Sequence, residues 1–115
     1  MDQWATQLRK GLVQFCLLKI LSRGQTYGYR LVQRLRGLNG LAFTESTVYP
    51  ALGRLIGEQL VRATERASSR GPRRRYLRLT RKGKEQLALM ETYWVDVCRD
   101  LESLEAAGLP EDGDD

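Results

Sequence analysis

The chain has 115 residues, of which 42% are hydrophobic and 29% are charged, and this suits one compact, soluble domain. The formal net charge of +5 hides an asymmetry, because seven of the 14 acidic residues lie in residues 100–115, which contain no Lys or Arg. The other 99 residues therefore carry a large basic excess, which favours a polyanionic partner, nucleic acid before a membrane surface. The absence of His excludes common catalytic triads and His-based metal sites.

Targeting signals and cofactor motifs are not recognisable. Residues 1–10 contain an acid and no apolar run, so we expect no signal peptide. The longest apolar runs, residues 15–18 and 87–90, are too short to span a membrane, and we expect a cytoplasmic protein without a membrane partner. Cys16 and Cys98 lie in apolar helical patterns and are expected to be two buried thiols. No Gly-rich phosphate loop is present, so we expect no cofactor, no metal and no enzymatic activity.

Two helices are predicted in the first third of the chain. Residues 8–21 show apolar positions at helical spacing, and the second half of this segment is apolar nearly all round, which indicates a buried helix. Gly24 is expected just beyond its C-terminal end. Thr26 is expected to cap a second helix at about residues 27–36. The turn cluster 37–40 follows. The apolar stripe of the second helix is Leu31, Val32 and Leu35.

Residues 41–43 are compatible with a short strand, and a third helix is predicted at about residues 44–59. Thr44 is the expected N-cap, and Glu45 is well placed in the first turn. Pro50 leaves two alternatives, because it lacks an N–H group: the helix begins near Pro50, or it begins at Glu45 and bends. The predicted buried side is Val48, Leu52, Leu55 and Ile56.

A hairpin with a long basic tip is predicted next. Residues 60–64 and 75–79 alternate apolar and polar positions as half-buried strands do, and residues 66–75 between them hold five arginines and the turn Gly71-Pro72. We expect this tip to be a mobile loop in which the like charges repel one another. Arginines that neutralise phosphates release counterions, so the tip favours nucleic-acid contact over a merely solvated turn.

The last predicted helix spans about residues 81–106 and is capped by Thr80. Its apolar positions are spaced 3, 4, 3, 4 and 3 residues apart, as in a heptad seam. Since the preceding unit already has a core, this seam favours a homodimer over packing within one chain. Residues 107–115 form an acidic tail that we expect to be disordered. The predicted dimer interface is Leu87, Met90, Trp94, Val97, Leu101 and Leu104.

Trp94 has two interpretations. It is an aromatic anchor against the dimer mate, or it lines a pocket for planar or cationic small molecules.

The order of three helices, a hairpin and a final helix is that of a winged helix-turn-helix. In such a unit the third helix enters the major groove, and the hairpin reaches the adjacent backbone or minor groove. Hydroxyl side chains, a tyrosine and an arginine on the exposed side of the third helix can contact phosphates or base edges, although an ordinary polar helix face would look the same. The candidate DNA-contacting residues are Thr44, Ser46, Thr47, Tyr49, Arg54, Arg70, Arg73, Arg74 and Arg75.

The chain resembles the PadR family of bacterial transcriptional regulators, especially its short members with a single C-terminal helix. The resemblance rests on QLRKGLVQFCLLKIL (7–21), YGYRL (27–31), STVYPALGRL (46–55) and RGPRRRYLRLTRKGKEQL (70–87). It implies a winged-helix dimer that represses neighbouring genes or its own gene, and releases DNA when an effector binds.

The resemblance also implies roles for single residues. Tyr49 matches the recognition helix, which implies that Pro50 lies inside that helix. Arg73 and Arg74 match the basic wing. Trp94 matches a tryptophan that stacks on aromatic ligands at the dimer interface of some short members.

Tyr27 and Tyr29 match a motif whose aromatic side chains pack near the DNA-facing side, which adds Tyr27 to the DNA-binding candidates. Two positions depart from the family: Ser46 stands where many members have Gly or Ala, and Val48 replaces a common Leu.

We therefore expect a mainly α-helical fold with a small β-hairpin wing. Residues 1–80 would form the winged helix-turn-helix domain, residues 81–106 the dimerisation helix and residues 107–115 the tail. The expected function is that of a transcriptional regulator, a repressor of a palindromic double-stranded DNA operator that a planar or aromatic effector releases. The alternative is a protein-interaction adaptor without specific DNA binding, which would have no reason to retain the basic wing.

Overall fold

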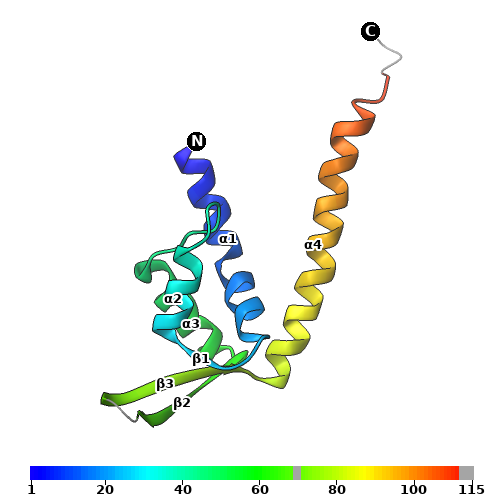
Figure 1. The fold of residues 1–115 in the computed structure, drawn as a ribbon. Coiled ribbons are helices and arrows are strands. Elements are labelled where there is room, and N and C mark those ends of the chain that lie inside the picture. The colour runs from blue at the N-terminus through cyan, green and yellow to red at the C-terminus, as the bar shows by residue number, and fades with distance from the viewer. Residues whose placement is uncertain (69–70, 112–115) are drawn as a thin grey trace.

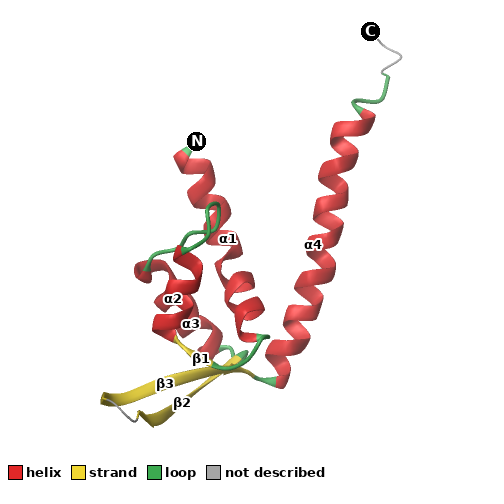
Figure 2. Ribbon diagram, viewed as in Figure 1, coloured by secondary structure: helices red, strands yellow, loops and turns green. Residues whose placement is uncertain are grey.

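The computed structural model describes residues 1–68 and 71–111, and within them the chain is mainly helical with one small antiparallel sheet (Figures 1 and 2). This confirms the predicted winged-helix fold class. The elements are α1 (Asp2–Leu21), β1 (Thr26–Tyr27), α2 (Gly28–Arg36), α3 (Glu45–Gly57), β2 (Val61–Ser68), β3 (Gly71–Leu79) and α4 (Arg81–Ala107).

Helix α1 supplies the centre of the core. Its second half is buried because apolar residues surround it on nearly every side, as expected from the sequence. The helix begins at Asp2, six residues earlier than predicted, because the polar first turns contain no residue that breaks a helix. Gly24 has a φ of 140°, a backbone conformation that favours glycine, and it turns the chain into β1. The buried residues of α1 are Val13, Phe15, Cys16, Leu17, Leu18 and Leu21.

The third strand of the sheet is β1, formed by Thr26 and Tyr27, and not residues 41–43, where the sequence suggested a short strand. Thr26 pairs with Leu77 in β1, so the prediction that Thr26 caps the second helix is wrong, and α2 begins at Gly28. Residues 41–43 are not a strand. The segment is a loop that places the side chain of Phe43 in the core. The strand order is β1-β3-β2.

Helix α3 begins at Glu45 and contains Pro50, which decides between the two alternatives that the sequence left open. Thr44 occupies the N-cap position, but its side chain accepts no capping hydrogen bond. The helix ends in a Schellman arrangement, in which the Leu60 N–H donates to the Leu55 carbonyl and Gln59 has a φ of 64°. The buried side is Val48, Ala51, Leu52 and Leu55, whereas Ile56 is only partly buried.

The described part of the wing is a two-stranded ribbon that extends further than the predicted strands, and residues 69–70 of the predicted mobile tip lie outside the described residues. Strands β2 and β3 stay paired from Val61 opposite Leu79 as far as Ser68 opposite Gly71. The predicted strands were too short, because backbone pairing with a neighbouring strand outweighs the weak strand propensity of arginine. An acid also lies within the arginine cluster, since Glu65 stands opposite Arg75.

Helix α4 leaves the body of the protein at a tight joint. Thr80 caps it as predicted: its Oγ1 accepts a hydrogen bond from the Gly83 N–H (3.0 Å) and donates one to the Gln59 carbonyl (2.6 Å). A Cβ atom added at Gly83 would collide with the Leu60 carbonyl, so glycine permits this close approach.

The C-terminal part of α4, beyond the contact of Trp94 with Phe15, projects away from the rest of the molecule (Figure 1). The Cα radius of gyration is 18.3 Å, whereas a compact domain of this length would have about 13 Å. Much of α4 is therefore not covered within one chain.

Candidate nucleic-acid interface

Helix α3 presents a polar side to solvent, because its apolar side is fixed in the core. Tyr49 is 46% exposed and Arg54 is also exposed, as the sequence predicted. Glu45, an acid on the same exposed side, is paired with Arg36 of α2 at 3.4 Å. This ion pair reduces the repulsion that Glu45, the one carboxylate in α3, would exert on a phosphate.

Gly28 allows α2 and α3 to approach each other closely. A Cβ atom added at Gly28 would lie 2.8 Å from Cε1 of Tyr49, which is closer than such atoms come in proteins. The first turn of α2 therefore rests against the ring of Tyr49. Any side chain at Gly28 would displace this ring from its present place.

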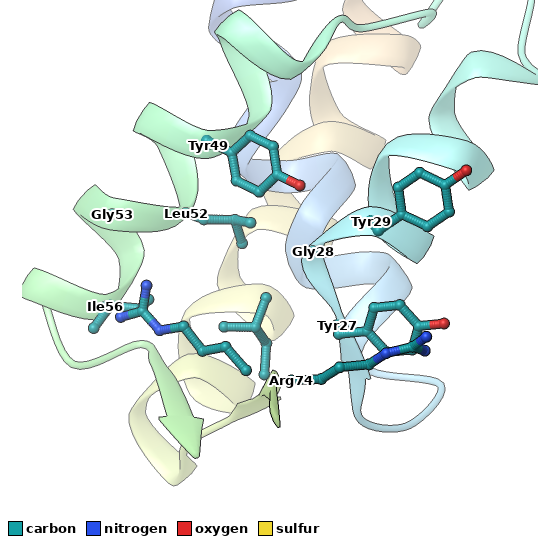
Figure 3. Close-up of a pocket in the computed structure, with 10 residues that line it drawn as sticks. Tyr27, Gly28, Tyr29, Tyr49, Leu52, Gly53, Ile56 and Arg74 are labelled. Carbon is teal, nitrogen blue, oxygen red and sulfur yellow. The ribbon is translucent and has the colours of Figure 1, made fainter. Parts of the chain in front are cut away.

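A cleft of about 440 Å³ lies between α3, the first turn of α2 and the wing (Figure 3). Three tyrosines from two different helices and a strand surround it, with apolar side chains between them and two arginines of β3 beside them. An aromatic and cationic cleft of this kind suits an anionic partner with exposed rings or sugar surfaces. The lining residues are Tyr27, Gly28, Tyr29, Tyr49, Leu52, Gly53, Ile56, Arg74, Arg75 and Leu77.

Tyr27 lies next to two arginines, Arg30 and Arg74. Arg30 donates a hydrogen bond from Nε to the Tyr27 hydroxyl at 3.2 Å. This hydrogen bond lowers the pKa of Tyr27 from its ordinary value, and the charges of Arg30 and Arg74 act in the same direction. Two guanidinium groups therefore lie beside this ring at the edge of the cleft.

The structure brings together only part of the predicted DNA-binding set. Tyr27, Tyr49, Arg74 and Arg75 line one cleft. The remaining α3 candidates lie outside it on the same helix: Thr44 and Ser46 face each other at its N-terminus (2.9 Å between hydroxyl oxygens), Thr47 is partly buried and Arg54 is exposed. Arg73 is exposed on β3, and Arg70 lies outside the described residues.

Sequence reasoning missed Arg30, Arg66 and Tyr76. Arg30 follows Tyr27 by three residues, which is one helical turn, and it lies next to the Tyr27 ring. Arg66 stands opposite Arg74 in the ribbon. The alternation along two paired strands was the signal that could have identified Arg66 and Tyr76, but it needs the register between the strands, which the sequence does not show.

A second pocket, of about 580 Å³, lies between α1 and α4. Trp94 of α4 meets Phe15 of α1 edge to face, with ring centroids 6.1 Å apart, so it already has a partner within the chain. Trp94 nevertheless remains 38% exposed and Tyr93 remains 71% exposed. Apart from Gln86, the residues that line this pocket are apolar or aromatic. They are Gly11, Leu12, Phe15, Leu89, Met90, Tyr93, Trp94 and Val97.

The predicted seam on α4 divides into two parts. Leu87 is buried in the core of its own chain, and Met90 packs against that core, so these two leave little surface for a partner. Leu101 and Leu104 are largely exposed, at 58% and 72%. Cys98 is only partly buried, which corrects the expectation of two buried thiols, whereas Cys16 is buried as expected.

Two negative observations complete the description of residues 1–68 and 71–111. No group of three or more Cys, Asp or Glu side chains that could hold a metal ion occurs in them. No helix in that part of the chain has both the length and the hydropathy needed to cross a membrane.

Comparison with known proteins gives a consistent result. Residues 17–89 match the PadR-like family of transcriptional regulators. The chain is similar to a PadR-like transcriptional regulator of Bacillus cereus, with 36% identity and a TM-score of 0.78, over 88% of this chain and 98% of that one. It is also similar to a PadR-like transcription factor of Bacteroides fragilis (30% identity, TM-score 0.74, 90% and 99% covered).

A PadR family regulator of Eggerthella lenta shares 27% identity with a TM-score of 0.80, over 93% of both chains. A protein of Lysinibacillus sphaericus is 28% identical over 90 residues, which are 76% of this chain and 83% of that one.

Proposed function

Because this chain belongs to the PadR-like family of transcriptional regulators, whose members bind DNA, we propose that it is a homodimeric repressor of a palindromic operator. The observation that carries the proposal is the cleft that Tyr49 of α3 lines together with Arg74 and Arg75 of the wing. A duplex that lies against the exposed side of α3 meets these arginines as well. One chain would therefore contact the major groove and a neighbouring phosphate backbone at the same time.

Base reading is assigned to α3 and phosphate contact to the wing. Tyr49 and Arg54 are exposed and long enough to reach base edges or phosphates from α3. The arginines of β3 stand on a paired strand, so their guanidinium groups approach the backbone from a fixed support. The proposed DNA-contacting set is Tyr27, Thr44, Ser46, Thr47, Tyr49, Arg54, Arg73, Arg74 and Arg75, with Arg70 added from the sequence alone.

A second copy of the chain is the proposed partner of α4. The exposed apolar residues of the projecting helix, Leu101 and Leu104 among them, support a self-complementary interface. Two copies related by a twofold axis would present two α3 helices to half-sites about one helical turn apart. In this division residues 1–80 bind DNA, residues 81–106 form the dimerisation helix and residues 107–115 are a tail.

The pocket between α1 and α4 is the proposed effector site. Trp94 and Tyr93 offer exposed aromatic faces, which suit a planar aromatic molecule, with or without positive charge. A ligand beside Trp94 would change how α4 lies against α1. Since α4 joins the two copies in this proposal, the same change alters the separation of the two α3 helices and releases the operator.

Selection of bound duplexes from a random pool tests the proposed DNA specificity. The expected product is an inverted repeat whose half-sites lie about one helical turn apart. A mobility-shift titration with the DNA upstream of its own gene, in excess random DNA, is the companion assay. An enriched pool without any repeat, and no preference for the upstream DNA, would instead favour the adaptor function.

Tryptophan fluorescence tests the effector site. The chain has two tryptophans, so Trp4→Phe leaves Trp94 as the only emitter. Planar cationic dyes are expected to quench this emission, and to lower the affinity for the selected duplex over the same concentration range. The matched control is Trp94→Phe, in which only Trp4 emits. Unchanged Trp94 emission in the folded dimer up to high micromolar dye would contradict the assignment.

A further inference from the structure

Three arginines lie over two tyrosine rings at the base of the wing. The guanidinium carbons of Arg30 and Arg74 lie 5.5 and 4.5 Å from the centroid of the Tyr27 ring. That of Arg66 lies 5.2 Å from the centroid of Tyr76. The two rings meet edge to face, with their centroids 5.5 Å apart. The three cations, which we name the arginine row, are thus connected through one aromatic pair.

The sheet register explains why these side chains meet. Tyr27 stands directly opposite Tyr76, and Arg66 stands directly opposite Arg74. Residues that stand opposite each other in an antiparallel pair share one face of the sheet. Arg30 joins them from the first turn of α2, which follows β1 without a gap. The row therefore extends from α2 to β3 and β2, and Tyr27 of β1 lies between α2 and β3.

Hydrogen bonds fix the two ends of the row. Arg30 donates from Nε to the Tyr27 hydroxyl at 3.2 Å. Arg66 donates to the side-chain oxygen of Gln25 at 3.3 Å. Both partners are neutral oxygens, so each guanidinium is oriented while its charge stays available.

No carboxylate neutralises the row within the described part of the chain. The ion pairs found there involve Lys19, Arg36 and Arg81, and none involves a member of the row. Glu65 is the acid next to Arg66 in sequence, but alternation along a strand directs it to the opposite face of the sheet. Three exposed cations that lack an acidic partner on the same face favour an anionic ligand.

The position of the row identifies that anion. Arg74 belongs both to the row and to the cleft that reaches Tyr49 on α3, and Tyr27, whose ring lies under Arg74, lines the same cleft. A ligand lying across α3 therefore meets the row with its outer edge, and the outer edge of duplex DNA in a groove is its sugar–phosphate backbone.

We propose that the arginine row binds the phosphate backbone beside the groove that α3 enters, and that Tyr27 and Tyr76 are positioning residues that hold its guanidinium groups. This rests on the proposed function, in which α3 and the wing face DNA. Orientation before binding matters because a free arginine side chain loses rotamer entropy when a ligand fixes it, and this loss weakens binding. The rings have already restricted this freedom.

The salt dependence of duplex binding tests the row itself. The probe is a labelled duplex of about 30 base pairs, which accommodates two half-sites one helical turn apart. Arg30→Ala and Arg66→Ala are each expected to lower the slope of log affinity against log salt by about 0.9 for every phosphate that the variant no longer neutralises. Arg99→Ala, on the projecting part of α4, is the control that removes a charge elsewhere, and its slope should equal that of the parent.

The tyrosines are tested by a change that keeps every charge. Tyr76→Leu is expected to weaken binding about two- to fivefold, the effect of one exposed cation–π contact, with an unchanged salt slope. Tyr76→Phe keeps the ring and should restore most of the parental affinity. A merely structural role would lower the melting temperature of Tyr76→Leu but leave the affinity of its folded fraction at the parental value, which would overturn the positioning role.

The outcomes also separate this inference from the proposed function. Arg73→Ala serves as reference, because Arg73 lies on the wing but outside the row. A lower slope in Arg73→Ala together with parental slopes in Arg30→Ala and Arg66→Ala would overturn the row and leave the proposed function intact. A parent protein that does not bind the duplex at low salt would overturn both.

Discussion

The wing and the outer half of α4 both project from the core, but they expose different chemistry. The wing exposes Arg66, Arg73 and Arg74, and it contributes Val61, Leu77 and Leu79 at its base to the core. The outer half of α4 exposes Leu101 and Leu104 among acidic residues. Neither surface is covered by the rest of the chain.

This difference indicates two different partners. Clustered guanidinium groups are stabilised by a polyanion and weakened by salt. Exposed leucines at helical spacing are stabilised when another apolar surface removes them from water. In the proposed function, the basic end of the chain faces DNA and the apolar end faces a second copy. The joint at Gly83 connects the two ends.

The largest effect is expected from a charge on the apolar end. Leu101→Glu should raise the dimer dissociation constant at least about a hundredfold, because an unpaired carboxylate would be buried in each copy. Sedimentation equilibrium measures this directly. Ser103→Glu places the same charge two residues away on the same helix and should leave the dimer intact. If Leu101→Glu sediments as the parent does, α4 does not form the interface.

The joint between the two ends is expected to be the next most sensitive place. Gly83→Ala should lower the free energy of unfolding by about 1–3 kcal/mol, because the added methyl group meets the Leu60 carbonyl. Gly53→Ala is the matched control in α3, where no heavy atom outside its own helix backbone lies within 4 Å, and it should gain up to about 1 kcal/mol. Denaturant titration at one protein concentration compares them, and equal stability of Gly83→Ala and the parent would contradict a tight joint.

At the basic end, Arg73→Ala combined with Arg74→Ala should lower the salt slope of duplex binding by about 1.8 and weaken binding about tenfold at low salt. The weakening should be similar for all sequences, because these side chains contact phosphates. Lys10→Ala with Arg99→Ala removes the same charge from other surfaces and serves as control. An unchanged slope in the wing variant would show that Arg73 and Arg74 do not contact phosphate.

The smallest effect concerns the two thiols. Burial raises the pKa of Cys16 above its ordinary value, and Lys19 opposes this only in part. The folded state favours the uncharged thiol of Cys16. The stabilisation that this residue contributes is therefore fully present at pH values below its ordinary pKa, and it is lost as the pH rises through the raised pKa. In the native protein a thiol reagent should modify Cys98 faster than Cys16. Equal rates would mean that Cys98 is as well covered as Cys16.

The sequence predicted best those elements whose signals are local. The Thr80 cap and the apolar spacing of α4 both lie within one segment, and the helix was predicted to within one residue at its C-terminal end. Strand β1 was missed because two residues carry no periodicity, and they form a strand only when β3 lies beside them. The length of the wing was underestimated for the same reason, since arginines extend β3 through pairing with β2.

The candidate site shows the same limit. Tyr49, Arg74 and Arg75 were indicated by helix faces, charge and the family resemblance, and the structure brings them to one cleft. Arg66 is one charge among many in the sequence, because its place opposite Arg74 depends on the register. The sequence could show how many cations the wing has, but not which of them share a face with an aromatic ring.

Two copies, joined through α4, are proposed to bind one duplex with both wings. The mass of the complex between the purified protein and a selected duplex, measured by sedimentation over a series of salt concentrations, tests this arrangement as a whole. We expect two chains per duplex at low salt and steep dissociation as salt is added. A protein that stays monomeric at micromolar concentration and does not bind the duplex at low salt would contradict it.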